Sequence, residues 1–578
     1  MKKAPFYQNW EVGDFRELLY EITERYAVNT AFLWREGPDE DSVMTKSYTE
    51  FAEDVKNLAT YLCALGLEGK TIAVTGKNSY LWMVSYLAIG CGVGTILPLD
   101  RDLRSDELLD LMTDACCAAV LYTADMEEKL SEIKNQGINF LPLVCADTYF
   151  ARGAELRAEG STIYDAHKVN PDEPGVLLYT SGTMGVAKGV LLSQHNICAD
   201  IENVCHRVKI VEEDRVLSHL PLHHTYECTT SLAILYSGGS IAFNDNLRRL
   251  PKDFNLFQPS ILITVPAILE FMTRFVRRGY AEARGGKLLL GIQKTASGVA
   301  GTTLKLLSEK AAQKNKRKIF STVDHFFGGR LRAILVGAAA LSPEIFKSFE
   351  AFGYSVYCGY GLTETAPISL MHDDSYRCAD DTGFPVFGVE ARIDEPDENG
   401  VGELCLRGPN VMLGYYKNPD ATAEVLRDGW FHTGDLACQK KNGAYKITGR
   451  MKSMIVSPNG KKIFPEELEA YLMRYPVISE CMVYAEEKNG VPQICAAVYP
   501  DKAEVAALIG ENEVDSASME KLRIVLYDLV REVNQSLPPY KHIRRLVIRK
   551  NEFLKTTTKK IRRSDPENTD APSESVAP

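Results

Sequence analysis

The chain has 578 residues, enough for several domains or for one large domain with a smaller companion. Hydrophobic residues make up 45% of it and charged residues 25%, a balance that excludes a wholly disordered chain and a collagen-like one. The net charge of −11 is opposite in sign to that of a typical nucleic-acid-binding protein, so we expect no nucleic-acid partner.

The 14 cysteines are scattered and form no Cys-x-x-Cys pair. This pattern is typical of reduced core thiols and favours neither a disulfide framework nor a zinc site. The stretch 1–15 contains two lysines but lacks the apolar segment of a signal peptide. The sequence therefore predicts a cytoplasmic protein.

Helical patterns alternate with short apolar strands over the first three quarters of the chain. An amphipathic helix is predicted over 48–65, ending at Gly66. Strands are predicted over 71–75, 118–122, 175–179, 261–265 and 333–336. This alternation predicts an α/β fold in which helices cover parallel sheets.

The uncharged stretch 78–99 is long enough to span a bilayer. Three glycines interrupt it and Pro98 ends it. We therefore favour a buried helix over 81–89 followed by a buried strand over 93–97.

A basic insertion occupies 271–332, where 14 Lys or Arg residues stand against three acidic ones. Its local charge of +11 leaves −22 for the rest of the chain. Three interpretations remain open: a solvated helical face, contact with an anionic membrane, and electrostatic steering of anionic substrates.

Beyond about Leu436 the pattern changes to hairpins and short α+β segments, with a tight turn expected between Ala437 and Tyr445. We place a domain boundary near 449–452. The acidic, Pro- and Ser-rich stretch 564–578 predicts a disordered tail.

The first motif with chemical content follows the strand at 175–178 and reads YTSGTMGVAKG over 179–189. Its glycines allow backbone N–H groups to approach a phosphate, and its hydroxyls and Lys188 complete an anion site. The spacing of a Walker A loop is absent, and a polar hairpin is the bland alternative.

Four further stretches are weaker evidence of function when each is taken alone. In YGLTE (360–364), the aromatic ring can lie against a planar base, and Thr363 and Glu364 suit phosphate and Mg²⁺. In DGWFHTGD (428–435), the carboxylate of Asp435 can accept hydrogen bonds from both hydroxyls of a ribose. The stretches 447–467 and 555–563 each have the composition of a basic surface loop.

Together and in this order, the five stretches resemble the adenylate-forming superfamily of acyl-CoA synthetases, peptide-synthetase adenylation domains and luciferases. The resemblance extends from Phe15 to Arg563. Within the superfamily the chain is most similar to the long-chain fatty acyl-CoA synthetase branch. That similarity rests on IVSPNGKKIFPEELE (455–469), on the basic insertion and on LPLHHTYE (220–227).

The resemblance assigns roles to matching positions. It places the phosphate loop at Thr180, Ser181, Gly182, Thr183 and Lys188, and the segment beside the adenine at Gly337, Ala338 and Ala339. Tyr360, next to Gly361, matches the adenine-stacking residue, Thr363 the phosphate hydroxyl and Glu364 the Mg²⁺ ligand. It also implies ribose contacts from Asp435 and Arg450, a hinge at Lys452, a catalytic amine at Lys560 and an acyl-site histidine at His224.

Two departures from the family pattern do not remove a functional group. Lys559 stands where the last motif usually has Gly, which leaves Lys559 as an alternative amine, although the register with 561–562 favours Lys560. Ala340 stands where Pro is frequent.

The resemblance implies a large N-terminal domain over 1–449, with a β-rich subdomain, a hinge at 450–452 and a small mobile α+β domain over 453–563. It implies that ATP and Mg²⁺ activate a medium- or long-chain fatty acid, that CoA accepts the acyl group, and that rotation about Lys452 removes Lys560 between these steps. An acyl carrier protein as acceptor, or an aryl or short-chain acid as substrate, remains open. A luciferase-like oxygenase and a non-catalytic nucleotide-binding protein are weaker alternatives, and the absence of a GxSxG motif argues against a serine hydrolase.

Overall fold

The computed structural model describes residues 7, 10–37, 41–134, 137–180, 187–244, 246–273, 321–457, 461–488, 491–509, 516–555, 561–563, 565–569 and 574–576. The chain divides into two compact units. The first comprises Met1–Thr180, Ala187–Glu390 and Leu406–Phe431, and the second Ser181–Val186, Ala391–Cys405 and His432–Pro578.

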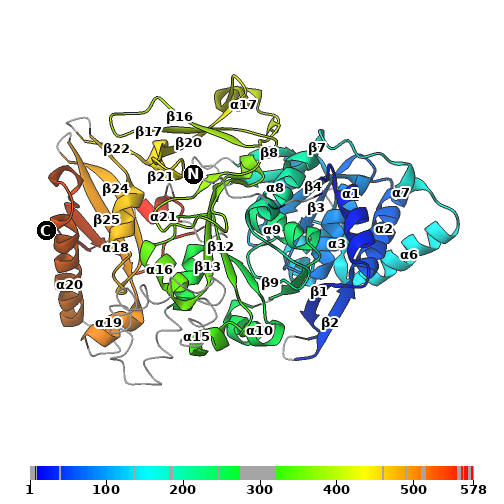
Figure 1. Cartoon of the computed structure of the whole chain (residues 1–578), viewed down its shortest axis with the longest axis horizontal. Coiled ribbons are helices and arrows are strands. Elements are labelled where there is room, and N and C mark those ends of the chain that lie inside the picture. The colour runs from blue at the N-terminus through cyan, green and yellow to red at the C-terminus, as the bar shows by residue number, and fades with distance from the viewer. Residues whose placement is uncertain are drawn as a thin grey trace. The chain divides into compact units, whose positions relative to one another are not determined.

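The first unit contains two mainly parallel sheets, which confirms the predicted α/β fold (Figure 1). The nine-stranded sheet has the order β15 (Phe384–Pro385), β14 (Ile368–Met371), β13 (Ser355–Gly361), β12 (Ala333–Val336), β11 (Ile261–Thr264), β9 (Arg215–Ser218), β10 (Ser240–Phe243), β1 (Thr30–Arg35) and β2 (Val43–Ser47). Its strands from β13 to β1 are parallel, and the strands outside them are antiparallel.

The seven-stranded sheet has the order β18 (Gly414–Tyr415), β8 (Lys188–Ser193), β7 (Pro174–Thr180), β4 (Gly94–Leu99), β3 (Lys70–Thr75), β5 (Cys117–Tyr122) and β6 (Asn139–Pro142). Its strands from β7 to β6 are parallel, whereas β8 and β18 are antiparallel. All the strands expected in the N-terminal half are therefore present.

The described α-helices of this unit are α1 (Phe15–Tyr26), α2 (Tyr48–Ala64), α3 (Tyr80–Ala88), α4 (Ser105–Asp114), α5 (Glu127–Ser131), α6 (Ala146–Ala158), α7 (Ile163–Ala166), α8 (Gln194–Arg207), α9 (Thr225–Tyr236), α10 (Leu250–Phe257), α15 (Ser321–Phe326), α16 (Pro343–Phe352) and α17 (Pro419–Val425). Helix α2 matches the predicted helix: a capping box between Ser47 and Glu50 starts it, and Gly66 at φ +75° follows its end. Helix α9 is buried on all sides and packs against α8, β9 and β10.

The uncharged stretch 78–99 forms α3, a π-helical turn over Ile89–Val93 and strand β4. Gly94 is required here because a Cβ atom on it would lie 2.0 Å from the Lys70 carbonyl oxygen of the paired strand. Among the residues described, no helix combines the length and the apolar character needed to cross a membrane.

The second unit contains most of a five-stranded sheet, with β16 (Glu390–Asp394), β17 (Val401–Arg407), β20 (Trp430–Gln439) and β19 (Leu426–Arg427) in that order and β21 (Tyr445–Arg450) paired to β20. A ribbon of β22 (Ile455–Val456) and β23 (Lys462–Ile463) follows. A four-stranded sheet has the order β24 (Ile478–Lys488), β25 (Val491–Pro500), β26 (Arg545–Ile548) and β27 (Glu574–Val576). Its helices are α18 (Pro465–Leu472), α19 (Lys502–Ile509), α20 (Ser516–Gln535) and α21 (Pro566–Thr569).

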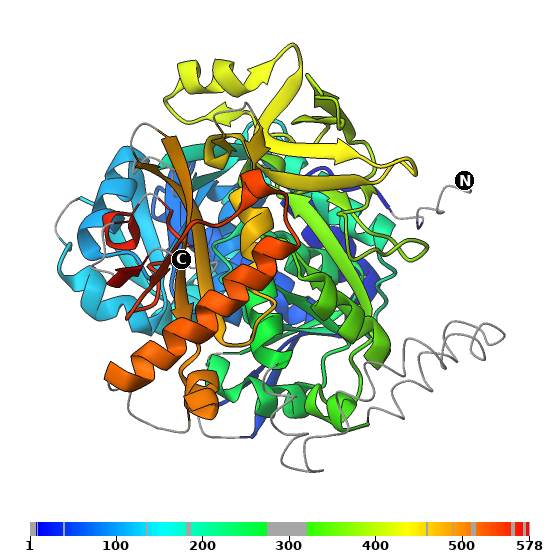
Figure 2. The ribbon, with the colours of Figure 1, turned by 90° about the vertical axis from the view of Figure 1, so that its left-hand side faces the viewer.

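Helix α20 covers one face of the four-stranded sheet, as the long orange helix in Figure 2 shows. Leu522, Leu526 and Val530 pack there against Val483 and Val498. This apolar core gives the C-terminal α+β region its own stability.

The division of the chain differs from the predicted boundary at 449, because 391–405 and 432–449 group with the C-terminal residues. The ion pair between Lys462 and Asp397 (3.9 Å) and the packing of Phe464 on Gly449 hold these segments in one unit. The hinge at 450–452 stays a prediction.

The disordered tail predicted over 564–578 is wrong for its described residues. Strand β27 pairs antiparallel with β26, and α21 precedes it. Asn568 is only 2% exposed and donates hydrogen bonds to the carbonyl oxygens of Leu554 (2.9 Å) and Arg562 (2.9 Å). Composition predicted disorder because it carries no information about an available strand edge or about a buried amide.

Candidate functional site

The two strands that flank the phosphate-loop motif are in place. Thr180 ends β7, Lys188 begins β8, and the Thr180 hydroxyl donates to the Lys188 carbonyl oxygen (3.4 Å). Ser181, Gly182 and Thr183 lie outside the described residues. The two described residues that flank the predicted loop, Thr180 and Lys188, therefore lie opposite each other in an antiparallel ladder.

Tyr415 links the loop lysine to the predicted magnesium ligand. The Lys188 Nζ lies 4.7 Å from the centre of the Tyr415 ring, and the Tyr415 hydroxyl donates to Glu364 Oε1 (2.9 Å). Burial, and then the Glu364 carboxylate, raise the pKa of Tyr415, so the phenol keeps its proton. A cation and a carboxylate from distant parts of the chain thus share one aromatic side chain.

Tyr415 is a site residue that none of the sequence motifs indicated. Tyr415 lies in the stretch GYYKNP at 414–419. In the structure, Asn418 caps α17 and Tyr415 pairs with Val190 on β8. Nothing local distinguishes this tyrosine from its neighbour Tyr416. Only the sheet pairing places it beside Lys188.

The YGLTE motif runs from the end of β13 into a 3₁₀ turn over Thr363–Thr365. Tyr360 pairs with Leu370 on β14, and the Glu364 carbonyl oxygen accepts the Met412 N–H (2.9 Å). The predicted adenine ring contact and the predicted metal ligand therefore follow each other at one strand end.

Gly361 has no room for a side chain, since a Cβ atom on it would lie 1.6 Å from the Pro367 carbonyl oxygen. We expect Gly361→Ala to destabilise the first unit by more than about 3 kcal/mol and to abolish nucleotide binding, because backbone must move to relieve the overlap. Calorimetry and titration with ATP measure both effects.

Gly359→Ala is the matched control, two residues earlier on the same strand. A Cβ atom there would meet its nearest neighbour, the Leu370 carbonyl oxygen, at an ordinary 3.5 Å. We expect this variant to stay within about 1 kcal/mol of the parent protein. Equal losses in the two variants would contradict the steric argument.

The predicted adenine-side segment Gly337–Ala338–Ala339 follows β12, which is parallel to β13. Both strands therefore present their carboxyl ends at the same edge of the sheet, where α/β proteins bind ligands. Ala338 has a φ of +68°, and a Cβ atom on Gly337 would lie 2.9 Å from the Tyr226 ring. The backbone at 337–338 therefore leaves no room for a side chain at the first position and is left-handed at the second.

His224 occupies the N-cap position of α9, where its ring lies 4.2 Å from that of His223. The His223 Nε2 atom lies 3.7 Å from Asp100 Oδ2, and burial lowers the pKa of His223 to about 3. At the other end of α9, Tyr236 has a packing role, because its ring stacks on that of Trp10 with 3.9 Å between the ring centres. Glu227 is 1% exposed.

Burial raises the pKa of Glu227 to about 8, although hydrogen bonds from Ser218 and from the His219 N–H act in the opposite direction. The folded state therefore keeps this proton at pH values where the unfolded chain has lost it. Stability must fall as the pH rises from about 4.5 towards 8. His219 and His223 have pKa values of about 4 and about 3, so they stay neutral over most of this range.

We expect Glu227→Gln to remove this pH dependence. Between pH 5 and pH 8, the free energy of unfolding of the variant should rise by roughly 2–5 kcal/mol relative to that of the parent protein. The reason is that the variant has no carboxyl to ionise. Calorimetric melting temperatures over that range measure the difference. A constant difference across the range would show that Glu227 ionises normally in the folded protein.

In the second unit, the predicted ribose contacts meet. Asp435 on β20 and Arg450 on β21 are directly opposite in the antiparallel ladder, and Arg450 Nε lies 2.8 Å from Asp435 Oδ1. The Asp435 side chain is 4% exposed and Arg450 is 45% exposed. Lys452 is exposed in a 3₁₀ turn after β21, whereas Lys559 and Lys560 lie outside the described residues.

Glutamates pair with several of the basic residues that precede Lys560. Lys541 pairs with Glu467 (2.6 Å), and Lys555 pairs with Glu480. Lys555 also forms an isolated antiparallel bridge with Ile561, so the two residues next to the 556–560 stretch are anchored to each other. These ion pairs offset part of the positive charge of the described residues in this region.

Known proteins resemble this chain over most of its length. A family model described as "AMP-binding enzyme" matches residues 20–416. The long-chain-fatty-acid–[acyl-carrier-protein] ligase AEE15, chloroplastic, of Arabidopsis thaliana is 26% identical over 585 residues, covering 88% of this chain and 78% of that protein. The long-chain-fatty-acid–CoA ligase FadD15 of Mycobacterium tuberculosis is 27% identical over 556 residues, covering 87% and 90%.

Among solved structures, ATP-bound MatB from Rhodopseudomonas palustris has a TM-score of 0.72 and 22% identity, covering 95% of this chain and 97% of that one. This similarity shows the fold.

Proposed function

Because this chain belongs to the AMP-binding enzyme family of adenylate-forming ligases, we propose that it joins a medium- or long-chain fatty acid to coenzyme A through an acyl-adenylate. The observation that carries the first half of this reaction is the Lys188–Tyr415–Glu364 connection. The names of the relatives support the fatty acid and the thiol acceptor.

The first step must bring an anion to a polyanion. The carboxylate of the fatty acid attacks the α-phosphorus of ATP, a mixed anhydride forms, and pyrophosphate leaves. We assign the phosphate contacts to Lys188 and to the hydroxyl of Thr363, since preorganised groups of this kind lower such barriers by several kcal/mol. Tyr415 orients Glu364 and packs under the Lys188 ammonium.

The residues at Glu364 fit a magnesium ion. Carboxylate oxygens are hard ligands that Mg²⁺ prefers, and Glu364 offers one in the turn that also carries Thr363. When bound with ATP, the ion would offset phosphate charge. The Tyr415 hydroxyl donates its hydrogen bond to Oε1 of Glu364 and does not use Oε2.

In the second step, the CoA thiol displaces AMP from the mixed anhydride. We assign the catalytic amine of the first step to Lys560 and the hinge between the steps to Lys452, both on sequence grounds. Removal of Lys560 by rotation of the C-terminal residues would open the path of the pantetheine arm.

Pyrophosphate release with a panel of acids from acetate to oleate, with aryl acids included, tests the substrate class. We expect medium or long fatty acids to give the highest kcat/KM. A preference for acetate or for an aryl acid would overturn the proposed substrate and leave the adenylating chemistry intact.

An acyl carrier protein is the second candidate acceptor, supported by the similarity to a [acyl-carrier-protein] ligase. The two acceptors share the phosphopantetheine thiol. Supplying CoA or a phosphopantetheinylated carrier protein to the preformed acyl-adenylate separates them, because only the true acceptor accelerates AMP release.

We also propose a cytoplasmic location with peripheral contact with anionic membranes, since the 271–332 insertion carries a charge of +11. Most of this insertion, 274–320, lies outside the described residues. Sedimentation with anionic and with neutral vesicles tests the contact, and equal binding to both would exclude it.

A further inference from the structure

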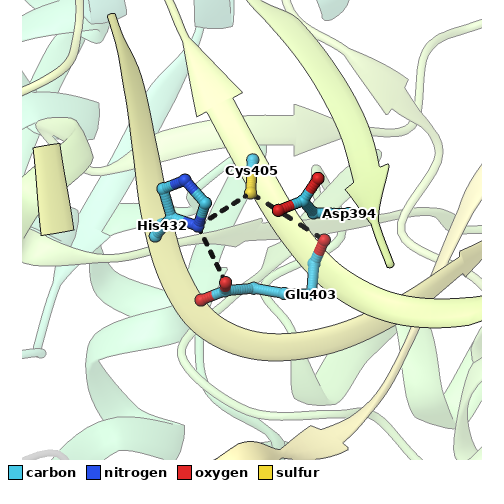
Figure 3. Close-up of side chains that lie close together, drawn as sticks. All are labelled: Asp394, Glu403, Cys405 and His432. Carbon is cyan, nitrogen blue, oxygen red and sulfur yellow. Dashed lines mark hydrogen bonds and ion pairs between the residues drawn. The ribbon is translucent and has the colours of Figure 1, made fainter. Parts of the chain in front are cut away.

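Three neighbouring strands of the second unit bring four metal-binding side chains together. Asp394 comes from β16, Glu403 and Cys405 come from β17, and His432 comes from β20 (Figure 3). Glu403 and Cys405 are two residues apart on one strand and therefore face the same side of the sheet. One ligand atom from each of the four residues lies within 4.8 Å of the other three.

The separations within the cluster approach those around a tetrahedral metal ion. Cys405 Sγ lies 3.3 Å from His432 Nδ1, and His432 Nδ1 lies 2.8 Å from Glu403 Oε2. Zinc–ligand bonds of about 2.0–2.3 Å place neighbouring ligand atoms roughly 3.3–3.6 Å apart. Small side-chain shifts would therefore complete the geometry.

We propose that Asp394, Glu403, Cys405 and His432 form a structural zinc site. A thiolate, an imidazole nitrogen and carboxylate oxygens are a donor set for zinc or cobalt, whereas magnesium and calcium prefer oxygen alone. On binding, the Cys405 thiol releases its proton to solvent. To bind the ion through Nδ1, His432 would have to carry its proton on Nε2.

Arg392 supplies a positive charge beside the proposed site. Its guanidinium lies 3.9 Å from Asp394 Oδ1 and is 43% exposed. Two carboxylates and a thiolate around a divalent ion leave one negative charge, which this guanidinium balances. Cys405 and His432 are buried, while Asp394 and Glu403 are half-buried, so the carboxylates face the solvent side through which an ion would enter.

The site would stiffen the part of β20 that precedes Asp435. Glu403 Oε1 accepts the Gly434 N–H (2.9 Å), and the Thr433 hydroxyl donates to the Leu404 carbonyl oxygen (2.7 Å). A metal ion held by Glu403 and His432 would therefore join β17 to the strand that carries Asp435. This role is independent of the adenylating chemistry and of the acid that is activated.

Cobalt binding to the full chain, stripped with a chelator, tests the proposal. We expect one tight equivalent of Co²⁺ with a thiolate-to-cobalt charge-transfer band, displaced by Zn²⁺. Cys405→Ser and Asp394→Asn should weaken binding at least about tenfold, and Cys405→Ser should also abolish the band. Zn²⁺ should raise the melting temperature of the parent protein but not that of either variant.

Cys438→Ser is the matched control, because Cys438 also lies on β20 but outside the cluster. It should keep the cobalt band and the stabilisation by Zn²⁺. If Cys405→Ser does not fold, Asp394→Asn alone decides, since this half-buried side chain lies at the solvent side. The proposal is overturned if the parent protein shows no band, or if Cys438→Ser loses as much binding as the cluster variants.

Discussion

Glu364→Gln is expected to reduce kcat/KM for ATP in acyl-adenylate formation by about 10²–10³-fold. The substitution preserves the volume of the side chain and an oxygen that can accept the Tyr415 hydroxyl, which lies 2.9 Å from Glu364 in the parent protein. It removes only the negative charge that we assign to magnesium binding. Pyrophosphate release at saturating fatty acid measures the loss, and the Mg²⁺ concentration needed for half-maximal rate should rise.

Tyr415→Phe separates the charge of Glu364 from its orientation. The variant keeps the aromatic ring, whose centre lies 4.7 Å from Lys188 Nζ, and loses only the hydroxyl. We expect a decrease of about tenfold, because the carboxylate remains but is less firmly oriented. If Tyr415→Phe is as impaired as Glu364→Gln, or if the Mg²⁺ requirement is unchanged in Glu364→Gln, the carboxylate does not bind the ion.

Lys560→Ala should separate the two half-reactions. We expect acyl-adenylate formation to fall by at least about 10²-fold, since the variant lacks the amine that stabilises the charge developing on the reacting oxygens. Thioesterification of a supplied acyl-adenylate should stay within a few-fold of the parent rate. Single-turnover assays of each half-reaction measure the split.

Lys559→Ala is the control for the register of this motif, because it removes a lysine one position earlier. We expect both half-reactions to persist in it. A loss confined to adenylation in Lys559→Ala would transfer the role to Lys559. Equal loss of both half-reactions in Lys560→Ala would contradict a role limited to adenylation.

Much of the fold could be predicted from the sequence because it depends on local patterns. Apolar runs at 71–75 and 333–336 are strands, and the helix at 48–64 begins at a capping box and ends before a glycine of positive φ. Periodicity and capping act over a few residues, so a sequence reports them directly. The glycines at 90, 92 and 94 likewise distinguished a buried helix and strand from a membrane span.

Predictions that depended on distant partners were less successful. The tail was expected to be disordered, yet β27 adds to the edge of β26 and Asn568 is buried. The boundary at 449 was expected to separate two domains, yet 432–449 group with the residues that follow. Composition describes a segment by itself, whereas an available strand edge belongs to another part of the chain.

The sequence by itself determined the family resemblance and the order of the motifs, because short motifs carry that chemistry in their spacing. The tertiary structure decided two matters that spacing does not encode. Tyr415 reaches both Lys188 and Glu364 only because β18 pairs with β8. Cys405 and His432, 27 positions apart, meet only because their strands are neighbours in one sheet. Strand pairing joins residues of any sequence separation, so such contacts leave no local signal in a sequence.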